Sequence, residues 1–121
     1  MIVGIGCDIV RVSRISRLLE IYGDHFKNRV FTIEEITAAD DISSKLLQCR
    51  YYAKRFAAKE ALSKAVGTGI SGKFGFLDIT VTNYASGAPR IICSKLNEVK
   101  AYISLSDEDD FAIAYVILEQ R

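Results

Sequence analysis

Residues 44–67 read SKLLQCRYYAKRFAAKEALSKAVG, and this stretch decides the fold. It has no Gly or Pro before its last residue, it is rich in Ala, Leu, Lys and Arg, and it opens on Ser44 and closes on Gly67. Ser is a favoured helix N-cap and Gly a favoured C-terminal stop. The stretch therefore predicts one long helix over 44–66, around which the other elements must pack.

Shorter elements precede this helix. Residues 2–10 alternate apolar residues with Gly, which predicts a strand whose glycines let other backbone approach closely. Ser13 is interpreted as the N-cap of a helix that stops at Gly23. Thr32 and Glu35 have the spacing of a capping box, which predicts a further short helix.

Mostly β elements follow the long helix. The last apolar run has apolar residues on both faces, which favours a central strand. The whole order predicts a single α+β domain over 1–121, in which an antiparallel sheet packs against the long helix and the shorter ones. The segments are two β runs at 77–83 and 89–94 joined by a turn at 85–88, a short helix at 94–100, and strands at 101–106 and 111–118.

Composition excludes several classes of protein. The chain has 121 residues, 50% of them hydrophobic and 26% charged, which argues against disorder. No apolar run approaches the roughly 18 to 20 residues that span a bilayer, and the opening residues lack the features of a secretory signal. Three widely spaced cysteines and one histidine favour reduced thiols over a disulfide framework or zinc site. We expect a cytoplasmic protein with no membrane association.

A net charge of +1 conceals two regions of opposite sign. Residues 45–73 hold seven Lys or Arg and one acid, whereas residues 106–121 hold five acids and one Arg. A solvated charged face is the ordinary interpretation. The alternative is a local anion site, since a nucleic-acid module more often has a basic balance over the whole domain.

One face of the long helix contains a carboxylate among core-type residues. Burying Glu60 there costs several kcal/mol unless it is paired or bound to a cation. Pairing with Lys64, one turn later, is one explanation. The other is Mg²⁺ held jointly with Asp8 at the end of the first strand, beside phosphates neutralised by nearby cations. The residues on this face of the helix are Cys49, Ala53, Phe56, Ala57, Glu60 and Lys64. The nearby cations are Arg55, Lys59 and Lys64.

The glycine-bearing stretch after the helix imitates a P-loop. Residues 67–73 match Gly-x4-Gly-Lys, but Phe74 replaces the magnesium-binding Ser or Thr, and the stretch follows a helix instead of a strand. We therefore exclude a P-loop NTPase. A helix cap and a backbone surface open to a phosphate remain as interpretations.

Taken together, the motifs resemble the holo-[acyl-carrier-protein] synthases of the 4′-phosphopantetheinyl transferase superfamily, over nearly the whole chain. The segments that carry the resemblance are Gly4-Ile-Gly-Cys-Asp8, Arg14, Phe31-Thr32 with Glu35, Arg55-Phe-Ala-Ala-Lys-Glu60-Ala-Leu-Ser-Lys64-Ala-Val-Gly67-Thr-Gly69, and Gly87-Ala-Pro89.

This resemblance implies transfer of 4′-phosphopantetheine from coenzyme A to a serine of apo acyl carrier protein, in support of fatty acid biosynthesis. It implies that Asp8 and Glu60 hold Mg²⁺ and act in catalysis with Lys64. Arg14 is expected to meet an acidic helix of the carrier protein. The coenzyme A site is expected to include Arg55, Ser63, Lys64, Gly67 and Pro89.

The resemblance also implies a homotrimer with active sites between subunits. Two positions depart from the family pattern: Asp107 stands where many members have His, and Arg11 replaces a frequent Glu. Other hypotheses are a catalytically silent module that binds coenzyme A, and, more weakly, an RNA-binding domain that uses the basic surface of 45–73.

Overall fold

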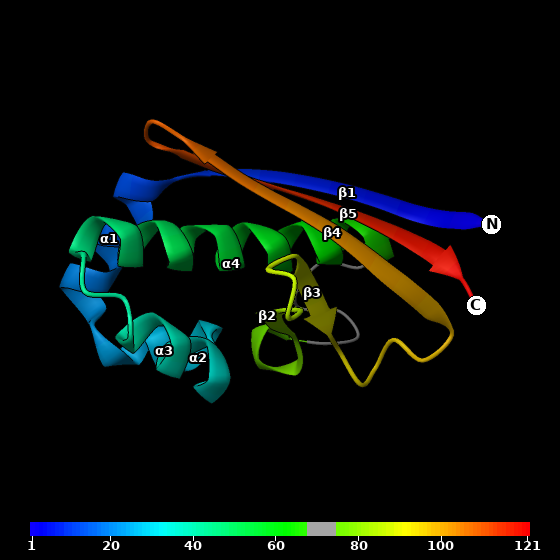
Figure 1. The fold of residues 1–121 in the computed structure, drawn as a ribbon, viewed down its shortest axis with the longest axis horizontal. Helices are drawn as coiled ribbons and strands as arrows, with labels where there is room; N and C mark the ends of the chain where they lie inside the picture. Colours follow the sequence, from blue (N-terminus) through cyan, green and yellow to red (C-terminus); the bar gives the residue numbers. More distant parts are fainter. Residues whose placement is uncertain (68–74) are drawn as a thin grey trace.

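A three-stranded antiparallel sheet packs with one face against the predicted long helix, and smaller elements cover the other side of that helix (Figure 1). This computed structural model describes residues 1–67 and 75–121. In chain order the elements are β1 (Ile2–Arg11), α1 (Val12–Tyr22), α2 (Asp24–Val30), α3 (Ile33–Asp40), α4 (Lys45–Val66), the 3-10 turn η1 (Phe76–Asp78), β2 (Thr80–Asn83), β3 (Pro89–Ile92), β4 (Val99–Glu108) and β5 (Phe111–Gln120).

The large sheet has the strand order β1-β5-β4, with both pairs antiparallel. The last strand is therefore central, as predicted. Its alternate residues face α4 and are fully or almost fully buried, which is the period of two that a strand imposes. These residues are Ala112, Ala114, Val116 and Leu118. The α+β prediction is confirmed.

Glycines in β1 allow the strand to approach α4 closely. A Cβ atom placed on Gly6 would collide with the carbonyl oxygen of Ala61 and lie 2.8 Å from the backbone nitrogen of Ala65. A Cβ on Gly4 would collide with the carbonyl oxygen of Ala65. The same face of β1 continues to Asp8, so this close contact brings that carboxylate against the helix.

The ends of α4 follow the local sequence signals. The Ser44 hydroxyl accepts a hydrogen bond from the Leu47 N–H at 3.2 Å, and Gly67 has a left-handed conformation with φ of 91°. A left-handed C-cap favours Gly because other residues meet a steric penalty there. The capping box that begins α3 is also present, between Thr32 and Glu35.

The start of α1 differs from its prediction. Ser13 is not the N-cap, because the helix begins at Val12 and its N-cap residue, Arg11, supplies no side-chain hydrogen bond. The capping acceptor comes from the β4–β5 turn, where Asp110 Oδ1 accepts from the Ser13 N–H at 2.9 Å and Oδ2 accepts from the Ser13 hydroxyl at 2.6 Å. A helix end can be satisfied by any well-placed acceptor, including one distant in sequence.

Three further predictions need correction. No helix forms at 94–100, where a turn leads directly into β4 at Val99. The β run predicted from 77 begins only at Thr80, because Phe76–Asp78 form η1. The short helix α2 was not predicted: Gly23, expected as a stop, both ends α1 and precedes α2.

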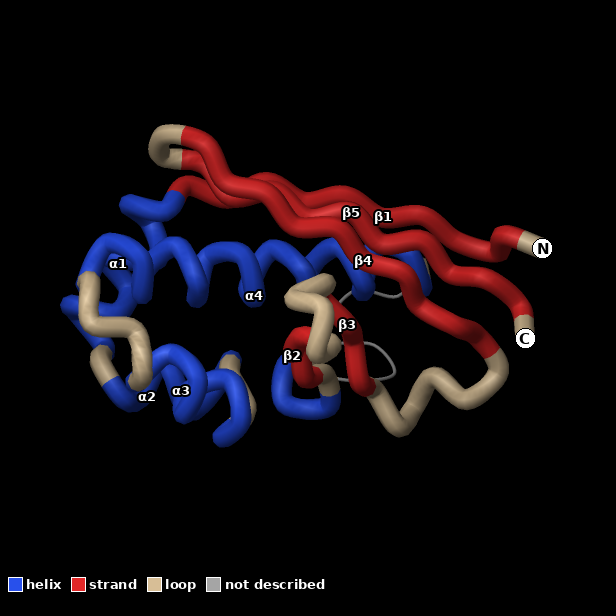
Figure 2. Tube along the Cα trace, in the orientation of Figure 1, coloured by secondary structure: helices blue, strands red, loops and turns tan. Residues whose placement is uncertain are grey.

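The elements on the far side of α4 are the α2–α3 pair and the β2–β3 hairpin (Figure 2). In the hairpin Asn83 pairs with Pro89 and Val81 with Ile91. Helix α4 is thus a central layer with the large sheet on one side and these small elements on the other. Within 1–67 and 75–121, no helix has both the length and the apolar character needed to cross a bilayer.

Candidate active site

Strand β1 and helix α4 bring three of the predicted catalytic residues together. Lys64 Nζ donates to Asp8 Oδ1 at 3.1 Å and to the carbonyl oxygen of Cys7 at 3.1 Å. Glu60 lies one helical turn before Lys64 and is close enough to Asp8 for the two negative charges to repel. The ion pair of Lys64 is therefore with Asp8, and not with Glu60 as one interpretation of the helix pattern had it.

The surroundings of Glu60, taken together, disfavour the charged form of its carboxyl group. The pKa of Glu60 is raised, first because burial disfavours its charged form and then because of the Asp8 charge. Lys64 and Arg14 act in the opposite direction and lower that pKa. A further cation between the two carboxylates would stabilise both charges.

The chemistry of these side chains fits Mg²⁺. Asp8 and Glu60 offer carboxylate oxygens, which magnesium prefers, and it commonly takes one or two carboxylates with water and phosphate oxygens as its other ligands. Within the described part of the chain, no cluster of three or more His, Cys, Asp and Glu side chains exists that could enclose a metal. The pair suits an ion that is completed by a bound phosphate.

Lys59 does not belong to this cluster, although it was considered among the cations around Glu60. Its Nζ is fully buried and donates to Glu35 Oε1 at 2.7 Å and to the carbonyl oxygens of Val30 at 2.7 Å and Phe76 at 3.0 Å. Burial lowers the pKa of Lys59, and the Glu35 carboxylate opposes that shift. This pair joins α2, α3, α4 and η1, and its role is structural.

Arg55 and Pro89 form a second group, on the hairpin side of α4. The Arg55 guanidinium is buried, stacks on the Tyr51 ring at 3.9 Å from its centroid, and donates through Nη2 to Asn83 Oδ1 at 2.9 Å. Asn83 pairs with Pro89 across the hairpin. Asn83 was not predicted, because a single Asn at a strand end has no distinctive sequence pattern.

The two groups lie at different angles around α4. Arg55 and Glu60 are five residues apart, which places their side chains about 140° apart around the helix axis. Ser63, between these directions, is buried, and its carbonyl oxygen accepts from the Gly67 N–H at 3.0 Å. The rest of the glycine-bearing stretch, at 68–74, lies outside the described residues.

Arg14 lines a groove formed by α1 and α2 with Phe56 of α4 and Phe76 of η1. The groove has a volume of about 500 Å³ and combines cationic walls with apolar side chains. The Arg14 guanidinium lies 5.8 Å from the centroid of the Phe56 ring, and its charge acts on Glu60. Other residues that line it are Leu18, His25, Phe26 and Arg29.

The two positions that depart from the family pattern both make ion pairs. Asp107 accepts from Lys54 Nζ at 2.8 Å and lies 4.0 Å from Arg50 Nη1, so this carboxylate is held by α4. Arg11 lies 3.9 Å from Asp110 and over the Phe111 ring. Asp107 therefore links the end of β4 to α4, and Arg11 lies beside the β4–β5 turn.

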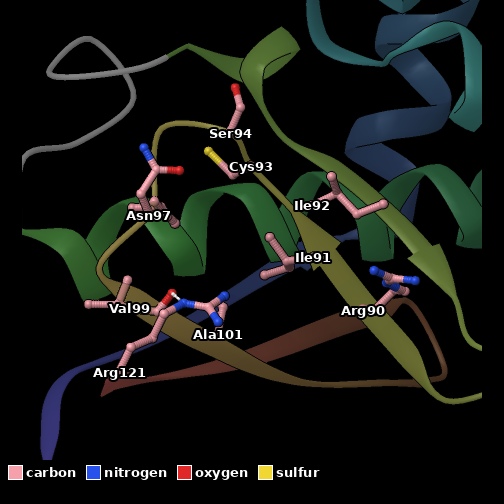
Figure 3. A pocket seen from close by; sticks show the side chains of 10 residues that line it. Arg90, Ile91, Ile92, Cys93, Ser94, Asn97, Val99, Ala101 and Arg121 are labelled. Atoms are coloured by element: carbon pink, nitrogen blue, oxygen red, sulfur yellow. Dashed lines mark hydrogen bonds between the residues drawn. The ribbon is translucent and has the colours of Figure 1, made fainter.

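Another cavity, of about 330 Å³, lies between β3 and the start of β4 (Figure 3). Arg90 and Ile91 line it from β3 and Val99 from β4, and Arg121 Nε donates to the Val99 carbonyl oxygen at 3.2 Å. The described residues around it include none of the predicted site residues. The predicted centre is therefore elsewhere, on α4 and β1.

Comparisons with known proteins show the family to which the chain belongs. The model of the 4′-phosphopantetheinyl transferase superfamily matches residues 4–116. A holo-[acyl-carrier-protein] synthase of Ehrlichia ruminantium (strain Gardel) is 46% identical over 100% of this chain and 99% of its own, and one of Ehrlichia chaffeensis is 47% identical over 98% and 97%.

Solved structures show the same similarity. A holo-(acyl-carrier-protein) synthase from Bacillus anthracis, in complex with CoA (3',5'-ADP), is 43% identical with a TM-score of 0.90 over 100% of this chain and 99% of that one. The enzyme from Helicobacter pylori, in complex with coenzyme A, is 33% identical with a TM-score of 0.82 over 95% and 99%. The sequence motifs, the fold and these relatives agree, and the chain belongs to the 4′-phosphopantetheinyl transferase superfamily, in its holo-[acyl-carrier-protein] synthase family.

Proposed function

We propose that the chain transfers the 4′-phosphopantetheine group of coenzyme A to a serine hydroxyl of apo acyl carrier protein, for fatty acid biosynthesis. The observation that carries this proposal is the convergence of Asp8 and Glu60 from two elements, with Lys64 bonded to Asp8. The names of the most similar relatives and the coenzyme A complexes of two solved neighbours support it.

The reaction exchanges the phosphoanhydride bond of the coenzyme A pyrophosphate for a phosphodiester bond to serine. The serine oxygen bonds to the phosphorus next to pantetheine as the hydroxyl gives up its proton to water, and the bond from that phosphorus to the bridging oxygen breaks to release adenosine 3′,5′-bisphosphate. Mg²⁺, held by Asp8 and Glu60, would neutralise pyrophosphate charge. Lys64 adds a cation that contacts the phosphates and stabilises the leaving group, which is the main demand of phosphoryl transfer.

The coenzyme A side of the site is assigned to Arg55, Ser63, Gly67 and Pro89. Arg55 supplies a buried cation beside the hairpin turn that leads to Pro89. Gly67 carries the left-handed turn at the end of α4. Because Arg55 and Glu60 diverge around α4, a coenzyme A molecule shared between subunits accounts for both groups better than one confined to a single chain.

The oligomer we propose is a homotrimer, formed through the outer face of the large sheet. Opposite the buried side of β1 and β5, that face exposes apolar residues, among them Ile5 at 65% and Ile9 at 59%. Further exposed apolar residues of the sheet are Tyr102, Tyr115 and Ile117. An apolar face of this extent is typical of a surface that another protein chain covers.

The carrier protein is proposed to dock at the groove between α1 and α2. Arg14, His25 and Arg29 provide positive or protonatable groups, and Phe26 and Phe56 provide apolar contact. This combination suits an acidic amphipathic helix. Since Arg14 also acts on Glu60, a helix bound there would present its serine next to the carboxylates.

The compartment we propose is the cytoplasm. Cys7, Cys49 and Cys93 are free thiols, and free thiols are typical of a reducing compartment.

The direct test is incubation of the protein with coenzyme A, Mg²⁺ and an apo acyl carrier protein, followed by mass spectrometry of the carrier. We expect a mass gain of one phosphopantetheine group, no gain after chelation of magnesium, and at least a 100-fold lower rate for Glu60→Gln, whose fold is retained. Coenzyme A binding without any carrier modification would contradict the proposal and favour a silent binding module.

A further inference from the structure

The β2–β3 hairpin is fastened to α4 by polar contacts at two levels. At the buried level, Lys59 holds Glu35, and Glu35 Oε2 accepts from the Val81 N–H at 2.8 Å. At the outer level, Arg55 Nη2 donates to Asn83 Oδ1 at 2.9 Å. Figure 1 shows the hairpin beside the middle of α4.

The spacing of these contacts explains why both form at once. Arg55 and Lys59 are four helix residues apart, a rise of about 6 Å, and Val81 and Asn83 are two strand residues apart, about 6.6 Å. The two separations are similar, so Arg55 can reach Asn83 while Lys59 reaches Val81 through Glu35. The outer contact adds to a placement that the buried one already secures.

Asn83 makes a second contact, toward the turn. Its Nδ2 donates to the carbonyl oxygen of Gly87 at 2.8 Å. Gly87 has φ of 93°, and its N–H donates to the Tyr84 carbonyl oxygen at 2.9 Å, while the Tyr84 N–H donates to the carbonyl oxygen of Ala88 at 2.8 Å. The turn at 84–88 is therefore fixed from within and tied to Asn83, directly before Pro89.

We propose that Asn83 is a positioning residue for the coenzyme A side of the site: its amide couples the Arg55 guanidinium to the turn that places Pro89. This inference rests on the proposed function, in which Arg55 and Pro89 contact coenzyme A. The carboxamide is suited to the task because its oxygen accepts from Arg55 while its nitrogen donates to Gly87, and a carboxylate or hydrocarbon side chain cannot do both.

Besides Asn83, the side chain that holds the Arg55 guanidinium is Tyr51. Arg55 is 5% exposed, one face of its guanidinium lies on Tyr51, and its Nε has no hydrogen-bond partner among the described residues. Loss of the Asn83 side chain would remove the acceptor that orients Nη2 toward the hairpin. Asn83 itself is exposed, so its replacement leaves the core intact.

Two variants separate the halves of the amide. Asn83→Asp keeps an acceptor for Arg55, but it replaces the donor to the Gly87 carbonyl oxygen with a second oxygen, which repels that carbonyl. Asn83→Leu removes both contacts. Asn97→Asp is the matched control, because it makes the same chemical change at another exposed asparagine outside the hairpin. Each protein is assayed as the full chain for the Kd of coenzyme A without carrier, the KM of both substrates, and the melting temperature.

We expect both Asn83 variants to raise the Kd and KM of coenzyme A about tenfold, with the KM of the carrier and the melting temperature nearly unchanged and Asn97→Asp like wild type. In an Arg55→Met background, Asn83→Leu should add little further loss, because the two residues act as a unit.

An unchanged Kd of coenzyme A in both variants, or an equal rise in the KM of both substrates, would overturn the positioning role of Asn83. The proposed function would still hold if the wild-type protein were active. Wild-type protein that neither binds coenzyme A nor modifies the carrier would overturn the proposed function and this inference with it.

Discussion

Lys64 Nζ lies 3.1 Å from Asp8 Oδ1, although the two residues are 56 positions apart and Glu60 stands one turn away on the same helix. The Asp8 side chain is 16% exposed and that of Lys64 is 56% exposed, so the lysine approaches the carboxylate from the open side. A ligand that reaches Asp8 therefore meets Lys64 as well. The close approach of β1 to α4 at Gly4 and Gly6 makes this contact possible.

The first prediction concerns Lys64. Lys64→Ala should lower the transfer rate about 100-fold, because a preorganised cation facing the leaving group is lost. The affinity for Mg²⁺ should not fall, since the variant removes a positive charge next to Asp8. Initial rates and a magnesium titration measure both quantities. Lys45→Ala, at the other end of α4, is the control, and a rate equal to that of wild type would exclude Lys64 from the reaction.

Arg14 provides a test of carrier docking. Arg14→Ala should raise the KM of the carrier protein about tenfold, which corresponds to about 1.4 kcal/mol of binding. The KM of coenzyme A should stay the same. Arg17→Ala is the matched control, because Arg17 is an exposed arginine of the same helix that is not among the residues lining the groove. Equal effects of the two replacements on the carrier KM would argue against docking in this groove.

The contact between Asp110 and Ser13 predicts a pH-dependent stability. Hydrogen bonds from Ser13 lower the pKa of Asp110 below its usual range. A carboxyl group whose pKa is lower in the folded state stabilises the fold above about pH 4, the pKa expected in the unfolded chain, and that contribution is lost as the pH falls through the lower folded value.

Asp110→Asn should therefore be less stable than wild type at pH 7, and the difference should shrink below pH 4. Denaturant unfolding at several pH values measures it. A stability difference that stays constant across this range would show that the charge of Asp110 has no part in capping α1.

The outer sheet face predicts the oligomeric state. Wild-type protein should elute as three chains in size-exclusion chromatography with light scattering, and Ile9→Glu should give single chains because it places a charge on the apolar face. Ile33→Glu is the control: Ile33 is 81% exposed but lies on α3, away from the sheet. Monomeric wild type, or a trimer that survives Ile9→Glu, would contradict assembly through this face.

Local signals allowed correct sequence predictions. Ser44 and Gly67 set the ends of α4 by their own backbone preferences, and Thr32 with Glu35 set the start of α3. Prediction failed where the residue that fixes a helix end is distant in sequence from that end. The cap of α1 comes from Asp110, 97 positions from Ser13, and no pattern around Ser13 reveals it.

In the candidate site, too, some residues were predicted correctly from local sequence motifs and others were not. The motifs around Asp8 and Glu60 predicted both acids, and the structure brings them together. Lys59 was misplaced because adjacent helix residues point about 100° apart, so a neighbour of Glu60 in sequence faces Glu35 instead. The link from Arg55 to Asn83 joins positions 28 apart and depends on how the hairpin packs against α4, which the sequence pattern does not specify.

A crystal structure of the protein with coenzyme A and Mn²⁺, determined with anomalous diffraction data, tests the shared metal ion most directly. We expect one anomalous peak about 2.1 Å from a carboxylate oxygen of Asp8 and from one of Glu60, with a pyrophosphate oxygen as a further ligand. Bound coenzyme A with no ion between these two carboxylates, or an ion that contacts neither of them, would contradict the account.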